Sequence, residues 1–372
     1  MEYSRLHSLK VVPEPQAGGC EWAPHFFICF CQREPPGVYV KDMTHFRKFF
    51  SWIVFFFVFY ACDEELNWNP IDTSGIEIKS VDVYVDYSSA IIFGDINVSD
   101  NMSRITGVEV HYGTTHEKLD NTANGEFDNV NGFSVELAQL EDGTQYYYRT
   151  DILVGKASVL GVVKDFVTFP LGPVDLDLPS GNKWASCNLG AAMPTESGDY
   201  FAWAEIQPKT RYDWDTYKWG NAYNNLVKYT TTSYNAVKDN IFELVKEDDA
   251  ASQILGEYYY TPSYNDWKEL FENCTITTLK VNGLSTIKIS SSKERNNNKK
   301  FIVLRGDTRY FKGTAITASD SGGHYWTSTL NTTDDSKARS IEVYSIDGTR
   351  VAQYDMSNER CFGLPIRPIY KK

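Results

Sequence analysis

The segment Val81-Asp-Val-Tyr-Val-Asp-Tyr87 decides the fold of the first folded part, because apolar and polar residues alternate along it. A period of two places every second side chain on the same face of a β-strand, where that face can be buried. Short strands at close spacing, with Gly, Asn and Asp between them, are typical of an antiparallel β-sandwich, and we expect one over residues 76–169. Further runs of this texture cover residues 105–112, 133–137, 146–150 and 164–169.

The stretch Leu140-Glu-Asp-Gly-Thr-Gln-Tyr-Tyr-Tyr-Arg149 spans one predicted turn and the strand after it. It resembles the L-x-P-G-T-x-Y-x-Y-R segment of fibronectin type III domains, with Asp142 where proline is usual. The resemblance implies a fibronectin III-like sandwich. It also implies that Tyr146 forms the tyrosine corner, in which a hydroxyl group contacts the backbone a few residues upstream.

Pro170-Leu-Gly-Pro173 ends this pattern and predicts a domain boundary. Beyond it, strands alternate with two predicted helices, which indicates an α+β domain over residues 174–372. Apolar residues at helical spacing predict the first helix within residues 233–255. Two hairpin turns are predicted at Asn282-Gly283 and Asp347-Gly348, because these dipeptides favour tight turns between strands.

The second predicted helix has two alternative starts. Thr261 can act as the N-cap with Pro262 at the first helical position. Alternatively, Ser263 and Asp266 form a capping-box-like pair, with Asp in place of the usual Glu. In either case Trp267 begins the apolar stripe that faces the core.

Several segments of the α+β part resemble one family, the Fibrobacter succinogenes major paralogous domain, which is common in exported proteins of the Bacteroidetes. The resemblance implies a C-type-lectin-like fold, distantly related to formylglycine-generating enzymes. Asp177 is a departure, because the family usually has glycine there. The segments that match, in the family's order, are 174–181, 183–191, 198–203, 261–270, 325–328 and 366–368.

The N-terminus carries an apolar run over residues 49–61, preceded by Arg47 and Lys48. A membrane-spanning helix needs about 20 residues, so this shorter run is typical of a signal-peptide core. We expect translation to start at Met43, with residues 1–42 as an unstructured upstream extension and residues 43–61 as the leader. Cys62, after Ala61, resembles the acylated cysteine of bacterial lipoproteins.

Asp63-Glu-Glu65 then resembles the surface-export signal of Bacteroidetes lipoproteins. Residues 62–75 form a polar tether. We therefore expect a lipid-anchored protein at the cell surface, held in the outer membrane by its N-terminal acyl chains. The formal net charge of −13 excludes a nucleic-acid partner, because neutralising phosphates requires a basic surface.

Catalytic and metal motifs are missing from the sequence. It contains no H-E-x-x-H, G-x-S-x-G, G-x-G-x-x-G or Walker sequence. Formylglycine-generating enzymes use a pair of cysteines near the C-terminus, where this chain has only Cys361. We expect no catalytic residue, no metal and no cofactor. An exported protein can pair two thiols, in which case we expect Cys187 with Cys274, and three packed thiols are the alternative.

Aromatic residues concentrate between Tyr200 and Tyr229, interleaved with Asp and Asn. Exposed rings can stack on sugar faces while carboxylates accept hydrogen bonds from hydroxyl groups, and the alternative is that the rings pack the long loops. The sequence predicts glycan or surface-macromolecule binding through loops 200–230 and 305–335, with a structural or stalk subunit as the alternative. We assign Trp184, Trp267 and Trp326 to the core. The candidate ligand-binding residues are Trp203, Trp214, Trp219, Tyr212, Tyr217, Asp213 and Asp215.

Overall fold

The computed structural model describes residues 70–372, except 100–101, 129–130, 232–234, 236–237, 294–299, 306–307, 312–313, 318–321 and 347–349. Contacts divide the chain into two units, Met1–Asn69 and Pro70–Lys372. The leader, Cys62 and most of the tether lie outside the described residues, so their roles remain predictions. Among the described helices, none has the length and apolarity needed to cross a bilayer.

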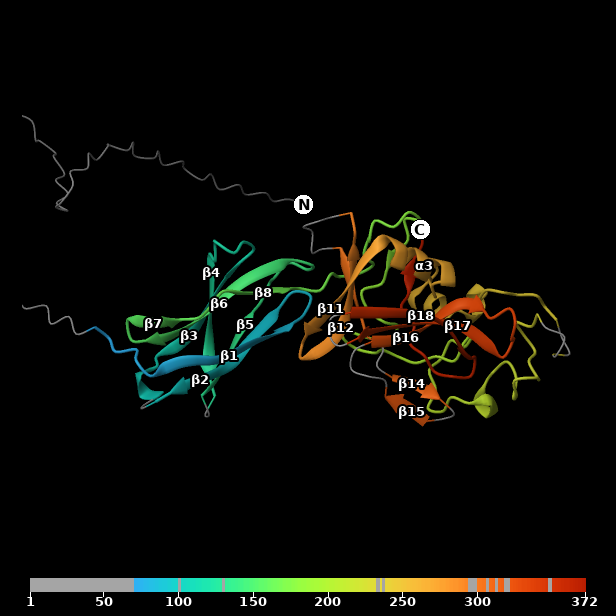
Figure 1. Ribbon diagram of the computed structural model, residues 1–372, viewed down its shortest axis with the longest axis horizontal. Helices are drawn as coiled ribbons and strands as arrows, with labels where there is room; N and C mark the ends of the chain where they lie inside the picture. Colours follow the sequence, from blue (N-terminus) through green and yellow to red (C-terminus); the bar gives the residue numbers. More distant parts are fainter. Residues whose placement is uncertain are drawn as a thin grey trace, which may run out of the picture. The chain divides into compact units, whose positions relative to one another are not determined.

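The first part of the described unit is an antiparallel sheet system that we call the N-terminal sheets (Figure 1). Its strands pair in the order β1-β2-β5-β4-β3-β6-β7, and β8 pairs with β6. A short 3₁₀ turn, η1 (Met102–Arg104), lies between β2 and β3. The strands are β1 (Ile76–Val85), β2 (Ala90–Val98), β3 (Gly107–Gly113), β4 (Asn121–Phe127), β5 (Gly132–Leu137), β6 (Gln145–Val154), β7 (Ala157–Leu160) and β8 (Lys164–Val167).

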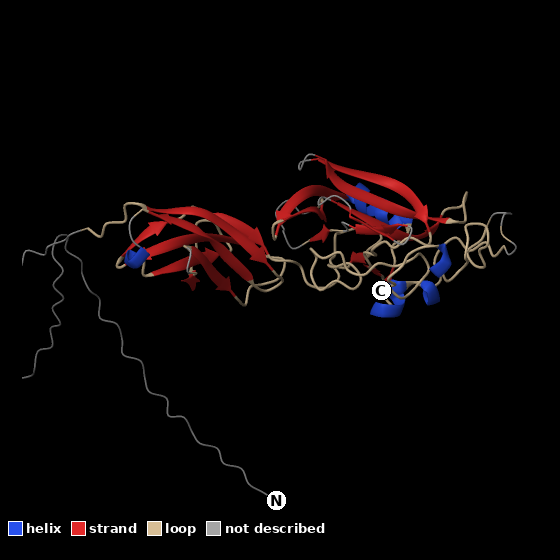
Figure 2. Cartoon of the chain, turned by 90° about the horizontal axis from the view of Figure 1, so that it is seen from below, coloured by secondary structure: helices blue, strands red, loops and turns tan. Residues whose placement is uncertain are grey.

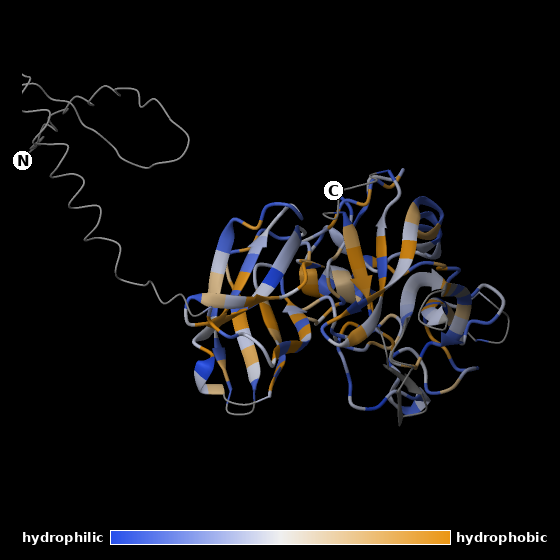
Figure 3. Ribbon diagram, turned by 60° about the vertical axis from the view of Figure 1, so that its left-hand side comes forward, coloured by the Kyte–Doolittle hydropathy of each residue, from blue (hydrophilic) through white to orange (hydrophobic). Residues whose placement is uncertain are grey.

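Alternation along these strands builds one apolar core. Ile92, Val110 and Ile152 come from three different strands and are fully buried. The apolar residues stand out along the strands in Figure 3. Tyr146 stacks on Phe166, and its hydroxyl group accepts a hydrogen bond of 3.0 Å from the backbone N–H of Glu141. This contact, expected for a tyrosine corner, fixes the loop that precedes β6.

The second part holds the two described α-helices and many long loops (Figure 2). Its strands form small antiparallel sheets ordered β10-β19-β9, β11-β12-β13, β14-β15 and β16-β17-β18. The mainly β, antiparallel character expected from the sequence is therefore confirmed. The strands are β9 (Lys183–Trp184), β10 (Tyr259–Tyr260), β11 (Cys274–Val281), β12 (Leu284–Ser291), β13 (Phe301–Leu304), β14 (Thr308–Phe311), β15 (Thr314–Thr317), β16 (Gly322–Leu330), β17 (Lys337–Ile346), β18 (Arg350–Glu359) and β19 (Ile369–Tyr370).

Helix α3 (Tyr264–Asn273) has Ser263 as its N-cap, which is the second of the two predicted starts. The Ser263 side chain accepts a hydrogen bond from the Asp266 backbone N–H, and the Asp266 carboxylate accepts one from the Ser263 backbone N–H. Two orphan donors are thereby satisfied at once. Trp267 and Leu270 on this helix are buried, as are Trp184 and Trp326, which confirms their predicted place in the core.

The predicted helix within residues 233–255 is wrong over most of its length. Helix α2 covers only Ala250–Leu255, after the 3₁₀ turn η3 (Lys246–Asp248). Ile241, Leu244 and Val245 still pack against a core cluster, but from a loop. The Asp239 carboxylate accepts hydrogen bonds from the backbone N–H groups of Tyr229, Thr230 and Ile241, and these bonds favour the loop over a helix.

The hairpin β11–β12 turns at Asn282-Gly283 as predicted, and its tip contacts β1. The Asn282 side chain accepts a hydrogen bond from the Val85 N–H at 2.7 Å and donates one to the Val85 carbonyl at 3.0 Å. Phe169 and Phe301 are buried in one apolar cluster close by. The second predicted turn, Asp347-Gly348, lies outside the described residues, although β17 and β18 pair on either side of it.

The conformation and the hydrogen bonds of Asp177 are compatible with an aspartate at a position where the resembling family usually has glycine. Its φ is +57°, in the left-handed region that glycine occupies most readily. Its carboxylate accepts hydrogen bonds from the Ser291 hydroxyl at 2.7 Å and from the Lys300 ammonium at 2.6 Å. These contacts offset the backbone cost of having a side chain at this position.

Candidate functional site

The aromatic segment between Tyr200 and Tyr229 runs mainly as loop across the C-terminal part. Its 3₁₀ turn, η2 (Trp214–Thr216), is capped by Asp213, whose side chain accepts a hydrogen bond from the Thr216 N–H. Phe201 forms an isolated β-bridge with Leu364 and so ties the segment to the end of the chain. The segment is therefore held by short-range caps and by long-range backbone pairing together.

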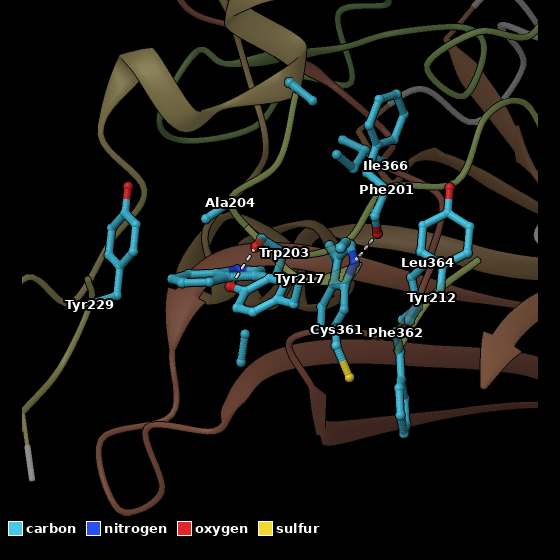
Figure 4. Close-up of a cluster of buried hydrophobic side chains, with 14 of the residues drawn as sticks. Phe201, Trp203, Ala204, Tyr212, Tyr217, Tyr229, Cys361, Phe362, Leu364 and Ile366 are labelled. Atoms are coloured by element: carbon cyan, nitrogen blue, oxygen red, sulfur yellow. Dashed lines mark hydrogen bonds between the residues drawn. The ribbon is translucent and has the colours of Figure 1, made fainter. Parts of the chain in front are cut away.

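Three of the candidate ligand-binding residues are core residues. Trp203, Tyr212 and Tyr217 are 1%, 1% and 6% exposed and belong to one buried cluster (Figure 4). The Trp203 indole N–H donates to the Thr327 carbonyl at 2.8 Å, and the Tyr217 hydroxyl donates to the Trp203 carbonyl at 2.9 Å. Burial removes these rings from contact with a ligand, so for them the packing alternative holds.

A buried guanidinium group explains why these rings gather. Arg360 is fully buried, and its planar group lies 5.0 Å from the Trp203 ring and 5.3 Å from the Tyr217 ring. Its N–H groups donate to the Tyr217 hydroxyl and to the backbone carbonyls of Lys228, Tyr229 and Asp335. Aromatic faces stabilise a desolvated cation, so the rings of this cluster stabilise the buried guanidinium group of Arg360. No motif in the sequence singled out this arginine.

A second buried arginine, Arg367, follows Arg360 by seven residues along the chain. Arg367 is fully buried and donates to the Asn188 side chain at 2.8 Å and to the Val303 carbonyl at 2.7 Å. It also donates to the carbonyls of Ala185 and Ser186. Burial lowers the pKa of this guanidinium. Arg367 lies in the segment that carries the family resemblance, and its hydrogen bonds give that segment a structural role.

Two candidate rings remain at the surface, Trp214 and Trp219, both half-buried. The Trp214 indole N–H donates to the Glu359 carboxylate at 3.1 Å. The ammonium groups of Lys218 and Lys228 lie 4.2 Å and 4.8 Å from the centre of the Trp219 ring. Both ammonium groups therefore lie over the face of the Trp219 ring, in cation–π contact with it.

Carboxylates surround the same surface. The Asp248 carboxylate lies 2.5 Å from Lys228 and 3.8 Å from Lys218, and it also accepts a hydrogen bond from the Tyr229 hydroxyl. Asp213 and Asp215 both pair with Arg211, and their side chains are 17% and 77% exposed. We call Trp214, Trp219, Lys218 and Asp215 the tryptophan surface. Trp214, Trp219 and Asp215 belong to the predicted ligand-binding set, whereas Lys218 was not predicted.

Two short acidic stretches, Glu247-Asp-Asp249 and Asp334-Asp335, have aspartates that are bonded within the fold. Asp249 is buried and caps α2, and its carboxylate accepts hydrogen bonds from both the backbone and the hydroxyl group of Thr261. Its burial raises the pKa. The Asp335 carboxylate accepts hydrogen bonds from Thr231. Over the residues that the structure describes, no group of His, Cys, Asp and Glu side chains is arranged to hold a metal ion.

The predicted Cys187–Cys274 disulfide is wrong, since all three described cysteines are free. The Cys187 sulfur lies 2.7 Å from the Tyr87 hydroxyl oxygen, while Cys274 packs beside a different apolar cluster at the end of α3. Burial raises the pKa of Cys274 to about 12 and also raises that of Cys361. Among the described residues the three cysteines are free thiols, as in the alternative drawn from the sequence.

Comparisons with known proteins were made for the sequence and for the fold. No family model and no curated protein matches the sequence. A β-sandwich protein from a computer-based redesign is 20% identical, with a TM-score of 0.20, over 24% of this chain and 90% of its own. The sensor domain of the anti-sigma factor RsgI4 from Pseudobacteroides cellulosolvens is 18% identical, with a TM-score of 0.21, over 27% of this chain and 100% of its own. At these TM-scores neither similarity bears on function.

Proposed function

We propose that this chain is an exported, lipid-anchored protein of the bacterial cell surface that binds glycan or another surface macromolecule without catalysing a reaction. Its location is inferred from the sequence alone, from the apolar run at 49–61 and from Cys62 after it. The binding role is supported by one structural observation. The tryptophan surface places two half-buried rings beside charged groups that solvent reaches.

We also propose that residues 76–169 are fibronectin III-like and residues 174–372 C-type-lectin-like. The pairing of β1-β2-β5 on one side and β3-β6 on the other supports the first assignment, because immunoglobulin-like sandwiches pair strands A, B and E, and strands C and F, in this way. The capping box at Ser263 and the buried Arg367 support the second assignment, since both lie in segments that carry the family resemblance.

The chemistry of the tryptophan surface suits a sugar. An indole face packs against the C–H groups of a pyranose ring, and neighbouring ammonium and carboxylate groups form hydrogen bonds with its hydroxyl groups. The side chains of Lys218 and Asp215 are 50% and 77% exposed, so a ligand can reach both once they exchange their partners Asp248 and Arg211. The rings of Tyr217 and Tyr229 pack edge-on against Trp214 and Trp219, respectively.

A glycan array probed with the full chain tests this role. The double variant Trp214→Ala with Trp219→Ala should lose at least about tenfold in affinity for any glycan that the wild type binds, because aromatic anchors carry much of such binding. Tyr258→Ala is the matched control, since that ring is 47% exposed and lies in a different loop. Binding that survives the double variant would show that the site is elsewhere.

The alternative is a structural or stalk subunit of a surface assembly. One observation favours it: the two hydrogen bonds between Asn282 and Val85 tie the C-terminal hairpin to β1, as a spacer under load requires. In that case the full chain should bind no glycan on the array and should co-purify with other envelope proteins.

A further inference from the structure

Strand register places three large apolar residues side by side on the outer face of β1 and β2. Tyr84 lies opposite Ile91, and Phe93 follows two residues after Ile91 on the same face. They are 45%, 41% and 41% exposed, whereas Ile92, between the two on β2, is fully buried on the other face. Contiguous exposed apolar residues on a folded domain mark an interaction surface more often than scattered ones do.

Carboxylates frame this patch. Asp82 on β1 pairs with Phe93, and Glu136 on β5 pairs with Ile91. Ser134 on β5 also pairs with Phe93, and Glu126 on β4 pairs with Ser134, so Glu126 lies on the same line across the sheet. A hollow of about 710 Å³ adjoins Phe93 and is also lined by Asp95 and Asp128. We call this region the acidic apolar face; it comprises Tyr84, Ile91, Phe93, Asp82, Asp95, Glu126 and Glu136.

Three carboxylates of this face, on Asp82, Glu126 and Glu136, have no cation paired with them among the described residues. None of the described residues that line the hollow is a lysine or an arginine. Like charges held close together repel, and an arriving positive group is attracted to all of them. The face therefore favours a cationic partner.

We propose that the acidic apolar face docks a basic segment of a partner protein, one in which Lys or Arg side chains alternate with large apolar ones. The apolar side chains would cover Tyr84 and Phe93, and the cations would pair with the surrounding carboxylates. A second copy of this chain does not fit, because two acidic faces would meet and each chain carries a formal charge of −13. A neutral sugar would leave the carboxylates unpaired on desolvation.

Fluorescence anisotropy with labelled peptides tests the proposal on the full chain. The probe is a heptapeptide that alternates Lys with Phe or Leu, and its partner replaces every Lys by Glu. We expect the cationic peptide to bind, with an affinity that falls as salt is added, and the acidic peptide not to bind. Equal binding of both peptides would overturn the proposal.

Three double variants separate the face from the overall charge. Asp82→Lys with Glu136→Lys, and Tyr84→Ser with Phe93→Ser, should each weaken binding of the cationic peptide at least tenfold. The control is Glu117→Lys with Glu257→Lys, which changes the net charge as much as the first variant does; these side chains are 85% and 65% exposed in other parts of the chain. It should change the affinity less than twofold.

Two further results would overturn the proposal. An equal loss in the control and in Asp82→Lys with Glu136→Lys would mean that the peptide responds to net charge alone. Binding of cellohexaose that disappears with Tyr84→Ser and Phe93→Ser would mean that the face is a sugar platform. Circular dichroism of every variant keeps loss of binding separate from loss of fold.

Discussion

Replacing Arg360 by methionine should destabilise the protein strongly. Methionine replaces the aliphatic stem of the side chain, but it leaves the place of the guanidinium group empty and donates no hydrogen bond. The change leaves the Tyr217 hydroxyl and the carbonyls of Lys228, Tyr229 and Asp335 without their donor inside the core.

The size of the effect follows from these contacts. A lost hydrogen bond costs about 1 kcal/mol, so the four acceptors together give about 4 kcal/mol. Loss of the cation–π contact with Trp203, at 5.0 Å, adds to this, while the relief of burying a charge offsets part of it. With an m-value near 3 kcal/mol/M in urea, the unfolding midpoint should fall by about 1.3 M.

Urea unfolding of the full chain, followed by tryptophan fluorescence, measures this shift. Arg211→Met is the control, because the Arg211 side chain is 58% exposed and its ion pairs with Asp213 and Asp215 are open to solvent. The control should change the free energy of unfolding by less than about 1 kcal/mol. If Arg360→Met unfolds at the wild-type midpoint, the cluster does not depend on its guanidinium.

Three further changes test other parts of the structure. The hydrogen bond from Lys300 holds the pKa of Asp177 below its ordinary value. The contribution of this carboxylate to the free energy of unfolding is therefore present above the ordinary pKa and is lost as the pH falls through the folded pKa. Asp177→Asn should cost about 0.5 kcal/mol at pH 7 and nothing in strong acid, as measured by urea midpoints at both pH values. Asn282→Gly keeps the positive φ of 53° but removes both hydrogen bonds to Val85, so it should lower the free energy of unfolding by about 2 kcal/mol in the same assay. An unchanged midpoint would show that these two hydrogen bonds do not stabilise the fold. The described cysteines, Cys187, Cys274 and Cys361, should react slowly with a thiol reagent in the native protein and rapidly after unfolding without reductant. A thiol that becomes reactive only after reduction would show that a disulfide is present.

Elements with strong local signals were predictable from the sequence. The alternation at Val81–Tyr87 corresponds to β1, and Asn282-Gly283 fixed the register of β11–β12 because its backbone accepts a tight turn. The capping box at Ser263 was one of two predicted starts, and it prevailed because it satisfies two donors rather than one.

Features set by long-range contacts were not predictable. Ile241 and Leu244 have helical spacing, but the Leu244 backbone N–H donates to the Ser328 carbonyl, and the Asp239 carboxylate binds the N–H groups of Tyr229 and Thr230; together these bonds hold a loop. The aromatic density at 200–229 looked like an exposed binding loop because composition does not report which face of a ring is covered. Arg360, the residue around which those rings pack, lies more than a hundred residues away along the chain.

The proposed surface role depends most on the export and acylation of the chain, and the intact mass of the membrane-extracted native protein tests both directly. We predict the mass of a chain from Cys62 to Lys372 with acyl groups added at its first residue and no hydrogens lost to a disulfide. A mass that includes residues 49–61, or recovery of the protein in the cytosol, would contradict the surface location and with it the binding role.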